Sequence, residues 1–326
     1  MTEQTTAIPT IAETTARAEQ ILDSIELAVV GKRRALELVL ATVLAGGHVL
    51  LEDNPGLGKT LAARSLAQTL GLDFARAQFT PDLLPADLTG SFIFDQRNAT
   101  FDFRKGPLFT GLLLADEINR TPPKTQAALL EAMQERQITV EGQTFHLPHP
   151  FHVIATANPV EYEGTYPLPE AQLDRFLARV SFGYPTEEEE IDVLQRRMQR
   201  QQEDISLNPV TDAAGLLGMQ AAIERLQVED SVVDYCVRLA AATRDHAQVL
   251  IGASPRGSLA LLLVGRALAV VRGRDFVTPE DIKTVALAVL SHRVTIKPEL
   301  WMSGVTASSV VRGLLGTVPA PPTAKD

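Results

Sequence analysis

Residues 53–60 read Asp53-Asn54-Pro55-Gly56-Leu57-Gly58-Lys59-Thr60. This stretch lies between a short apolar run at 48–52 and a pattern of helical spacing that begins at Thr60. A strand that enters a helix through small residues is the setting of a phosphate-binding loop, because backbone N–H groups and the helix N-terminus converge on phosphate oxygens. In such a loop Lys59 would contact the β- and γ-phosphates, and the Thr60 hydroxyl would bind Mg²⁺. The stretch therefore predicts a site for a nucleoside triphosphate.

Asp53 departs from the usual pattern of this loop, which has a glycine at that position. A carboxylate beside phosphates is unfavourable unless it points away from them, because like charges repel. We therefore expect the side chain of Asp53 to face outward.

A second motif, Leu112-Leu113-Leu114-Ala115-Asp116-Glu117, is an apolar strand that ends in two acids. Ligands of open α/β sheets bind at the carboxyl ends of the strands, where both carboxylates would lie. Asp116 could then hold Mg²⁺, and Glu117 could polarise the attacking water. Many strands end in solvated acids, and only the pairing with the phosphate loop favours the functional interpretation. Asp116 lies 56 positions after Thr60, which predicts one further strand between the two motif strands.

A third strand, 151–156, leads into Ala157-Asn158-Pro159. Asn158 could orient the lytic water between Glu117 and the γ-phosphate. A strand that ends in Asn-Pro is also a common turn, and the residues alone favour the turn.

Strands and helices alternate from residue 48 to residue 182, which predicts a parallel sheet with helices on both faces. Two expected β-hairpins interrupt the alternation, 91–94 with 100–103 and 137–140 with 143–147. Two helices around Val30-Gly31-Lys32 precede the first strand. The fold class is therefore α/β, a phosphate-loop core with a parallel sheet and two hairpin inserts, followed by a smaller all-helical domain.

The expected domains are a disordered N-terminal tail at 1–17, the α/β core at 18–185, the helical domain at 186–317 and a disordered C-terminal tail at 318–326. Both tails lack an apolar pattern that could be buried. The acidic run that opens the helical domain is typical of a helix start, with Thr186 as N-cap and Glu189 completing a capping box.

The 326 residues carry 30 Lys and Arg against 40 Asp and Glu, a net charge of −10. This balance argues against a general binder of nucleic acids or membrane surfaces. Cys236 is the single cysteine, which excludes an intrachain disulfide, and the 6 histidines show no metal-ligand spacing. The N-terminus lacks the layout of a signal peptide, and no apolar run reaches the roughly 18 residues of a membrane span. We therefore expect a cytoplasmic protein without a transmembrane segment.

Four other side chains are interpreted as structural. Cys236 lies on an apolar helical face and is expected to fill the core. Trp301 is expected in the core of the helical domain. His292 and Arg293 could contact nucleotide, but a packing role is favoured.

The chain resembles the MoxR family of AAA+ ATPases over most of its length. The residues that carry the resemblance are the phosphate loop from Glu52 to Thr60 and six further blocks: Phe79–Pro85, Gly106–Phe109, Ala115–Arg120, Pro122–Gln126, Ala128–Met133 and Tyr166–Phe176. Together these blocks are far more specific than a phosphate loop alone.

The resemblance implies a ring, usually a hexamer, with ATP at the subunit interfaces. Asn158 matches the sensor 1 position, Arg175 matches an arginine finger that reaches the neighbouring subunit's γ-phosphate, and Arg256 matches sensor 2 in a helical lid. The implied nucleotide-binding residues are Val30, Gly31, Asn54, Pro55, Gly56, Leu57, Gly58, Lys59, Thr60, Leu61, Asp116 and Arg256. The implied catalytic residues are Lys59, Glu117, Asn158, Arg175 and Arg256, with Thr60 and Asp116 on Mg²⁺. The two hairpins match the helix 2 insert and the pre-sensor 1 insert.

Other interpretations of the arginines stay open. A positioned guanidinium accelerates phosphoryl transfer by about 10³–10⁵. Arg175 could instead pair with Asp174 or Glu170, and Arg256 could be a surface cation. Arg120 is a second candidate for the finger that acts on the neighbouring subunit.

The resemblance implies an ATP-driven motor that remodels or matures client proteins, or inserts a metal or cofactor into them, usually with a von Willebrand factor A-domain (VWA) partner. The sequence does not name the client. The ATPase subunit of a magnesium-chelatase-like complex is an alternative that uses the same motor parts. The acidic balance disfavours a DNA-associated motor. The full set of catalytic residues disfavours a scaffold that binds ATP without hydrolysing it.

Overall fold

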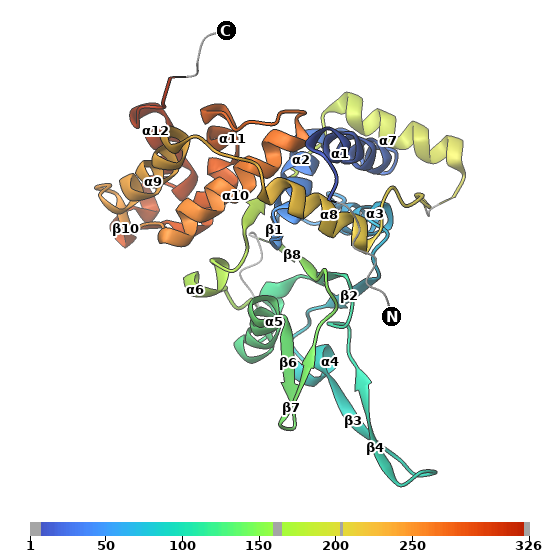
Figure 1. Cartoon of the computed structure of the whole chain (residues 1–326). Helices are drawn as coiled ribbons and strands as arrows, with labels where there is room; N and C mark the ends of the chain where they lie inside the picture. Colours follow the sequence, from blue (N-terminus) through green and yellow to red (C-terminus); the bar gives the residue numbers. More distant parts are fainter. Residues whose placement is uncertain (1–7, 159–164, 203–204, 323–326) are drawn as a thin grey trace.

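The computed structural model describes residues 8–158, 165–202 and 205–322. Its centre is a five-stranded parallel sheet with the strand order β2-β5-β8-β1-β9 (Figure 1). The strands are β1 (Val49–Glu52), β2 (Phe74–Gln78), β5 (Leu112–Asp116), β8 (His152–Ala157) and β9 (Ala178–Val180). β8 lies between β1 and β5 and pairs with both in parallel. The prediction of one strand between the two motif strands is confirmed.

The sheet is covered on both faces, because side chains alternate across each buried strand. Leu112 and Leu114 of β5 join one hydrophobic cluster, and Leu113 joins the other. The first cluster also contains residues of α1 (Ile11–Glu26), α2 (Arg33–Leu44), α3 (Lys59–Thr69) and the second domain. The second cluster contains residues of α4 (Pro85–Thr89) and α5 (Pro123–Glu135). The expected three-layer α/β arrangement is confirmed.

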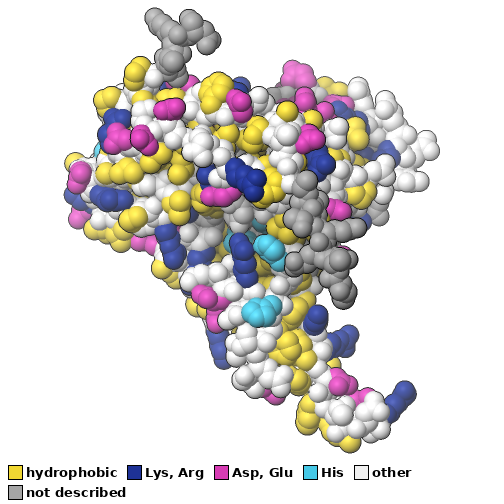
Figure 2. All heavy atoms as spheres, viewed as in Figure 1, with side chains coloured by type: hydrophobic (Ala, Val, Ile, Leu, Met, Phe, Trp, Pro, Cys, Tyr) yellow, Lys and Arg dark blue, Asp and Glu magenta, His cyan; other side chains and the backbone are white. Residues whose placement is uncertain are grey.

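Two β-hairpins form what we call the hairpin arm. β3 (Gly90–Asp95) pairs with β4 (Thr100–Lys105), and β6 (Gln137–Val140) pairs with β7 (Gln143–His146), both antiparallel as predicted. The arm projects from the body of the protein (Figure 1). Figure 2 shows hydrophobic side chains on its surface, and Ile93, Phe94 and Phe101 are exposed there.

The chain that follows Thr186 is mainly helical, as predicted, and we call this part the second domain. Its helices are α7 (Glu187–Arg200), α8 (Ala213–Glu224), α9 (Asp230–Arg244), α10 (Pro255–Val271), α11 (Pro279–Leu290) and α12 (Ala307–Thr317). Thr186 caps α7 and Glu189 completes the capping box, which confirms that helix start. This part also contains a small antiparallel pair that was not predicted, β10 (Val249–Ile251) with β11 (Thr295–Ile296). Such short strands leave no periodic pattern in the sequence.

Two residues expected in the core of the second domain have opposite outcomes. Cys236 is buried, as predicted, and burial raises the pKa of its thiol to about 12. Trp301 is 68% exposed, so its expected place in the core is wrong. It lies in a short 3₁₀ segment, η3 (Pro298–Ser303), which carries no buried residue.

The N-terminal helix begins inside the segment 1–17 that the sequence predicted to be a disordered tail. Thr10 caps α1 and Glu13 completes a capping box, so residues 11–17 are helical and that part of the prediction is wrong. At the other end, α12 ends at Thr317, and residues 318–322 form no helix or strand. One hydrophobic cluster joins the sheet to the second domain, so the domain boundary at residue 186 stays a prediction.

No helix in the described part of the chain is both long enough and apolar enough to cross a membrane.

Candidate functional site

The predicted phosphate loop connects β1 to α3 at the carboxyl edge of the sheet. Gly56 and Gly58 have φ angles of 82° and 78°, a left-handed conformation that favours glycine. A Cβ on either residue would meet none of the described atoms within 4 Å beyond its own chain neighbours, so space is open there. α3 begins without a hydrogen-bonded side-chain cap. Its first N–H groups are therefore left for an anion, which is the arrangement that a phosphate needs.

Lys59 opens α3 with its ammonium group beside the loop. Its Nζ donates to the carbonyl oxygens of Asp53 at 2.5 Å and Asn54 at 3.3 Å. Burial lowers the pKa of Lys59, and the nearby carboxylates of Asp53, Asp116 and Glu117 oppose this shift. A phosphate would offer the ammonium group stronger, charged acceptors than these carbonyls.

The expectation that Asp53 faces outward is wrong, because its side chain is buried. Its carboxylate accepts hydrogen bonds from Ser181 Oγ at 2.7 Å and from the N–H groups of Phe182 at 2.5 Å and Gly183 at 3.3 Å. These donors follow β9, which lies beside β1 in the sheet. Three hydrogen bonds therefore hold the charge of Asp53, a compensation that the local sequence could not reveal.

The two predicted acids lie at the end of β5. Glu117 follows Asp116 in a left-handed conformation with φ of 59°. Thr156 of β8 lies between them: its hydroxyl accepts from the Glu117 N–H at 2.8 Å and donates to Asp116 Oδ1 at 2.6 Å. The neighbouring strand thus fixes both acids, a role for Thr156 that the sequence analysis did not predict.

The acids also contact three side chains whose contacts the sequence analysis did not predict. Arg76 donates to Asp116 Oδ2 from Nε at 3.0 Å and from Nη2 at 2.7 Å. Gln78 donates from Nε2 to Glu117 Oε2 at 2.6 Å, and Arg120 Nη1 lies 3.3 Å from the same oxygen. The signal for the first two is the placement of polar residues at alternate positions of β2, next to the motif strand in the sheet.

A cavity of about 360 Å³ lies where these elements meet. Its lining consists of Pro55, Gly56, Leu57, Gly58, Lys59, Thr60, Leu61, Asp116, Glu117, Thr156, Ala157 and Asn158. Asn158 is buried at the end of β8. Of the predicted loop residues, Asn54 is not in the lining and donates instead to the Tyr184 hydroxyl at 3.1 Å. Pro159 lies outside the described residues.

The donor set at this cavity fits Mg²⁺ bound together with a triphosphate. The Thr60 hydroxyl and the Asp116 carboxylate are oxygen ligands of the kind that Mg²⁺ prefers, and in nucleotide sites it takes only one or two carboxylates besides phosphates and water. The described residues contain no group of three His, Cys, Asp or Glu that could hold a metal alone. A metal here would therefore depend on the nucleotide.

Val30 and Gly31, which the resemblance places among the nucleotide-binding residues beside the adenine, have different surroundings. Gly31 lines a cavity of about 470 Å³ that also includes Lys32, Phe182 and Glu189. A Cβ on residue 31 would lie 2.1 Å from the Glu189 side chain, which would have to move, and the φ of 71° at Gly31 is a left-handed conformation that favours glycine. Val30 is partly buried and is not in that lining.

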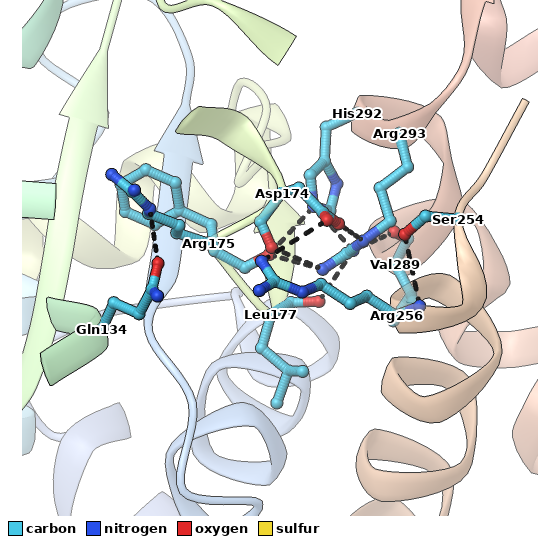
Figure 3. A network of polar contacts seen from close by, with 10 residues as sticks. Gln134, Asp174, Arg175, Leu177, Ser254, Arg256, Val289, His292 and Arg293 are labelled. Atoms are coloured by element: carbon cyan, nitrogen blue, oxygen red, sulfur yellow. Dashed lines mark hydrogen bonds and ion pairs between the residues drawn. The ribbon is translucent and has the colours of Figure 1, made fainter. Parts of the chain in front are cut away.

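Arg175 and Arg256 do not line the phosphate-loop cavity of their own subunit. Arg175 donates from Nε to Gln134 Oε1 at 3.2 Å, not to Asp174 or Glu170 as the alternative interpretation had it. Arg256 has a side chain that is 60% exposed, and its Nη1 lies 3.8 Å from Asp174 Oδ2 (Figure 3). The structure therefore gathers the loop, the acids and Asn158, and leaves these two arginines elsewhere.

Comparison with known proteins agrees with this geometry. Residues 48–178 match the family model described as "ATPase family associated with various cellular activities (AAA)", and residues 241–314 match the model described as "AAA lid domain". A putative ATPase from Cytophaga hutchinsonii, solved as a crystal structure, superposes with a TM-score of 0.89 at 39% identity, covering 96% of this chain and 97% of that one.

Among the relatives that match nearly the whole chain, two are the most informative. "Uncharacterized protein YeaC" of Bacillus subtilis is 48% identical over 301 residues, 92% of this chain and 93% of the relative. "Chaperone MoxR1" of Mycobacterium tuberculosis is 42% identical over 317 residues, 93% of this chain and 82% of the relative. The protein therefore belongs to the MoxR family of AAA+ ATPases.

Proposed function

We propose that the protein hydrolyses ATP with Mg²⁺ and uses the cycle to remodel partner proteins. The observation that carries this proposal is the single cavity into which the phosphate loop, Asp116, Glu117 and Asn158 all open. Phosphoryl transfer requires positioning and charge stabilisation rather than covalent catalysis, and these residues supply both.

The predicted binding and catalytic residues of the cavity each have a task in this proposal. The N–H groups of the loop and Lys59 bind the phosphates, and Thr60 and Asp116 hold Mg²⁺. When bound, the ion neutralises charge that develops on the phosphate oxygens. Glu117 leaves its contacts with Gln78 and Arg120 and takes a proton from the attacking water. Asn158 orients that water.

The remaining predicted residues act between subunits, on the subunit's own nucleotide or beside its adenine. We assign Arg175 to the γ-phosphate of a neighbouring copy in a ring, usually a hexamer in this family, and Arg256 to sensing of the protein's own nucleotide. The absence of both guanidiniums from their own cavity lining supports a separate role for each. Val30 and Gly31 would lie beside the adenine. Arg120 is the less favoured finger, because it already contacts Glu117 of its own subunit.

The biological task is proposed from the family. The name of the mycobacterial relative, a chaperone, supports action on client proteins, and we propose a VWA-domain protein as partner and the cytoplasm as location. The exposed Ile93, Phe94 and Phe101 of the hairpin arm offer an apolar surface of the kind that protein contacts use.

Two variants test the ATPase proposal. Lys59→Ala should abolish ATP binding, because the charge that faces the phosphates is lost. Glu117→Gln should keep ATP binding and lower turnover by about 10²–10⁴, the usual contribution of a general base. Labelled ATP retained on the protein and phosphate release at high protein concentration measure the two effects.

Matched controls separate these effects from loss of charge in general. Lys124→Ala and Glu131→Gln change exposed residues of α5 outside the cavity and should leave both quantities near wild type. Normal ATP affinity in Lys59→Ala, or undiminished turnover in Glu117→Gln, contradicts the proposal. Affinity purification of Glu117→Gln with ATP then distinguishes a VWA partner from chelatase-type subunits.

A further inference from the structure

The segment that carries Arg175 is joined to the second domain by a buried arginine. Arg293 ends η2 (Ser291–Arg293), the short turn after α11. Its Nε lies 2.7 Å from Asp174 Oδ1, and its guanidinium also donates to the carbonyl oxygens of Phe176 at 2.9 Å and Leu177 at 3.2 Å (Figure 3). A further bond goes back to the carbonyl of Val289. One side chain therefore holds three nearby residues of the core segment 174–177.

This junction is enclosed by protein. The side chain of Arg293 is only 3% exposed and that of Asp174 is 20% exposed. Burial lowers the pKa of Arg293, and the Asp174 carboxylate opposes that shift. His292 is buried beside it, with Nε2 3.0 Å from the Phe176 carbonyl. Charged hydrogen bonds in such surroundings are stronger than at the surface and fix the groups that they join.

Arg175 follows Asp174 directly, and it lies on the other side of the segment. In Figure 3 its side chain and Gln134 lie apart from the cluster formed by Asp174, Arg293 and His292. The backbone that sets the direction of Arg175 is therefore the backbone that Arg293 holds. A shift of η2 would move this backbone, because the contacts with Arg293 are made to carbonyl groups as well as to a side chain.

The same carboxylate also faces Arg256. Asp174 Oδ1 is bound by the buried Arg293, whereas Asp174 Oδ2 lies 3.8 Å from Arg256 Nη1, on a side chain that is 60% exposed. A longer contact at an exposed position contributes little and is easily released. Arg256 can therefore leave Asp174 for a phosphate, while Arg293 keeps its hold on the segment.

We propose that Arg293 is a positioning residue: through Asp174 it ties the Arg175 segment to the helical domain, so that movement of this domain in one subunit displaces the finger offered to the next. The inference rests on the proposed function, since it presumes that Arg175 acts on a neighbouring subunit. Arg293 touches no nucleotide in this arrangement and acts only through the segment 174–177.

Mixed assemblies test this assignment. Arg293→Gln alone should bind ATP like the wild type and turn over about 100-fold more slowly, because a displacement of about 1 Å in a positioning group costs that much. Mixed with Glu117→Gln subunits, which cannot hydrolyse ATP but offer an intact finger, Arg293→Gln subunits should regain turnover. Arg293→Lys, which keeps the charge without the planar fork, should recover only part of the activity.

Three references make the outcome decisive. Arg175→Ala mixed with Glu117→Gln should regain turnover in the same way; if it does not, the finger role itself fails and the inference falls with it. If that mixture recovers and Arg293→Gln with Glu117→Gln does not, the proposed function stands and the inference is overturned. Arg274→Gln is the control, because it breaks an ion pair with Asp281 inside the second domain. If mixing with Glu117→Gln raises the turnover of Arg274→Gln as much as that of Arg293→Gln, the inference is also overturned.

Folding of the variants is measured in parallel by thermal unfolding. If Arg293→Gln does not fold, Asp174→Asn is tested in the same mixtures. This variant breaks the same ion pair by removing the carboxylate and keeps the arginine. Recovery of Asp174→Asn with Glu117→Gln supports the assignment, and no recovery overturns it.

Discussion

Two arginine–aspartate ion pairs in this protein have the same nitrogen–oxygen distance, but their arginines differ in exposure to solvent. Arg76 lies 2.7 Å from Asp116 at the nucleotide cavity, and Arg293 lies 2.7 Å from Asp174 at the junction between sheet and second domain. The side chain of Arg76 is 51% exposed, and that of Arg293 is 3% exposed. Water therefore reaches the guanidinium of Arg76, whereas the guanidinium of Arg293 is enclosed by protein. Distance alone therefore does not tell a replaceable contact from a fixed one.

The chemical surroundings of the two aspartates agree with this difference in exposure. Asp116 is a proposed Mg²⁺ ligand, and binding of the ion would compete with its contact to Arg76. Asp174 lies outside the nucleotide cavity, and its arginine also binds carbonyl groups that no ligand replaces. The exposed pair suits a site that exchanges ligands, and the buried pair suits a connection that transmits movement.

The largest expected difference between the pairs is in stability. Asp174→Asn leaves the guanidinium of Arg293 buried without a countercharge and should lower the free energy of unfolding by about 3–5 kcal/mol. Asp116→Asn leaves Arg76 half in water and should cost about 1 kcal/mol or less. Urea unfolding of the nucleotide-free variants measures both values. Equal losses would show that the difference in exposure does not matter.

A fall in pH provides a second, smaller test of stability. Buried histidines lie at the amino end of the sheet, His48 before β1 and His152 at the start of β8, and at the junction, where His292 lies. Burial lowers the pKa of His152 to about 4 and that of His48 to about 3, and it lowers the pKa of His292 well below its usual value. An unfolded histidine, with a pKa of about 6.5, binds its proton first as the pH falls. Stability present at pH 7 should therefore decrease from about pH 6.5 downward, by up to about 1.4 kcal/mol per pH unit for each histidine.

His152→Asn sharpens this measurement. The asparagine Nδ2 can replace the His152 Nδ1 that lies 2.9 Å from the Gly47 carbonyl, but it cannot be protonated. The slope of unfolding free energy against pH between 6.5 and 4.5 should become shallower in this variant. An unchanged slope would mean that His152 is already charged in the folded protein.

The smallest expected effect concerns Mg²⁺. Arg76→Gln removes the cation that competes for Asp116 and should lower the Mg²⁺ concentration for half-maximal turnover about fivefold, which corresponds to about 1 kcal/mol for an exposed pair. Arg238→Gln, which breaks an exposed pair with Asp234 in the second domain, is the control and should leave this concentration unchanged. A higher Mg²⁺ requirement in Arg76→Gln would assign Arg76 a supporting role instead.

The sequence predicted the parts of this architecture that neighbouring residues encode. The loop between β1 and α3, the acids after β5 and the turn at Glu141-Gly142 each depend on a few consecutive residues with special conformations, and all lie where expected. The spacing of 56 positions between Thr60 and Asp116 predicted that β1 and β5 are not neighbours, although the strand between them, β8, follows both in the chain. These features are local, so the pattern that predicts them is local too.

The pairs compared above could not be predicted in this way. Asp174 and Arg293 are 119 positions apart, and Arg76 and Asp116 are 40 apart, so only the packed fold brings them together. The same limit explains Asp53 and Trp301: whether a side chain is buried depends on distant elements that cover it. Residues 11–17 are a different case, because Thr10 and Glu13 form a capping box, which is a local signal for the start of a helix.

Asp53 stands where such loops ordinarily have glycine, and the exchange has a mechanical consequence. Its carboxylate holds Ser181, Phe182 and Gly183, and the chain continues from there into α7 within a few residues. A displacement of α7 would therefore act on the proposed phosphate loop through the side chain of Asp53.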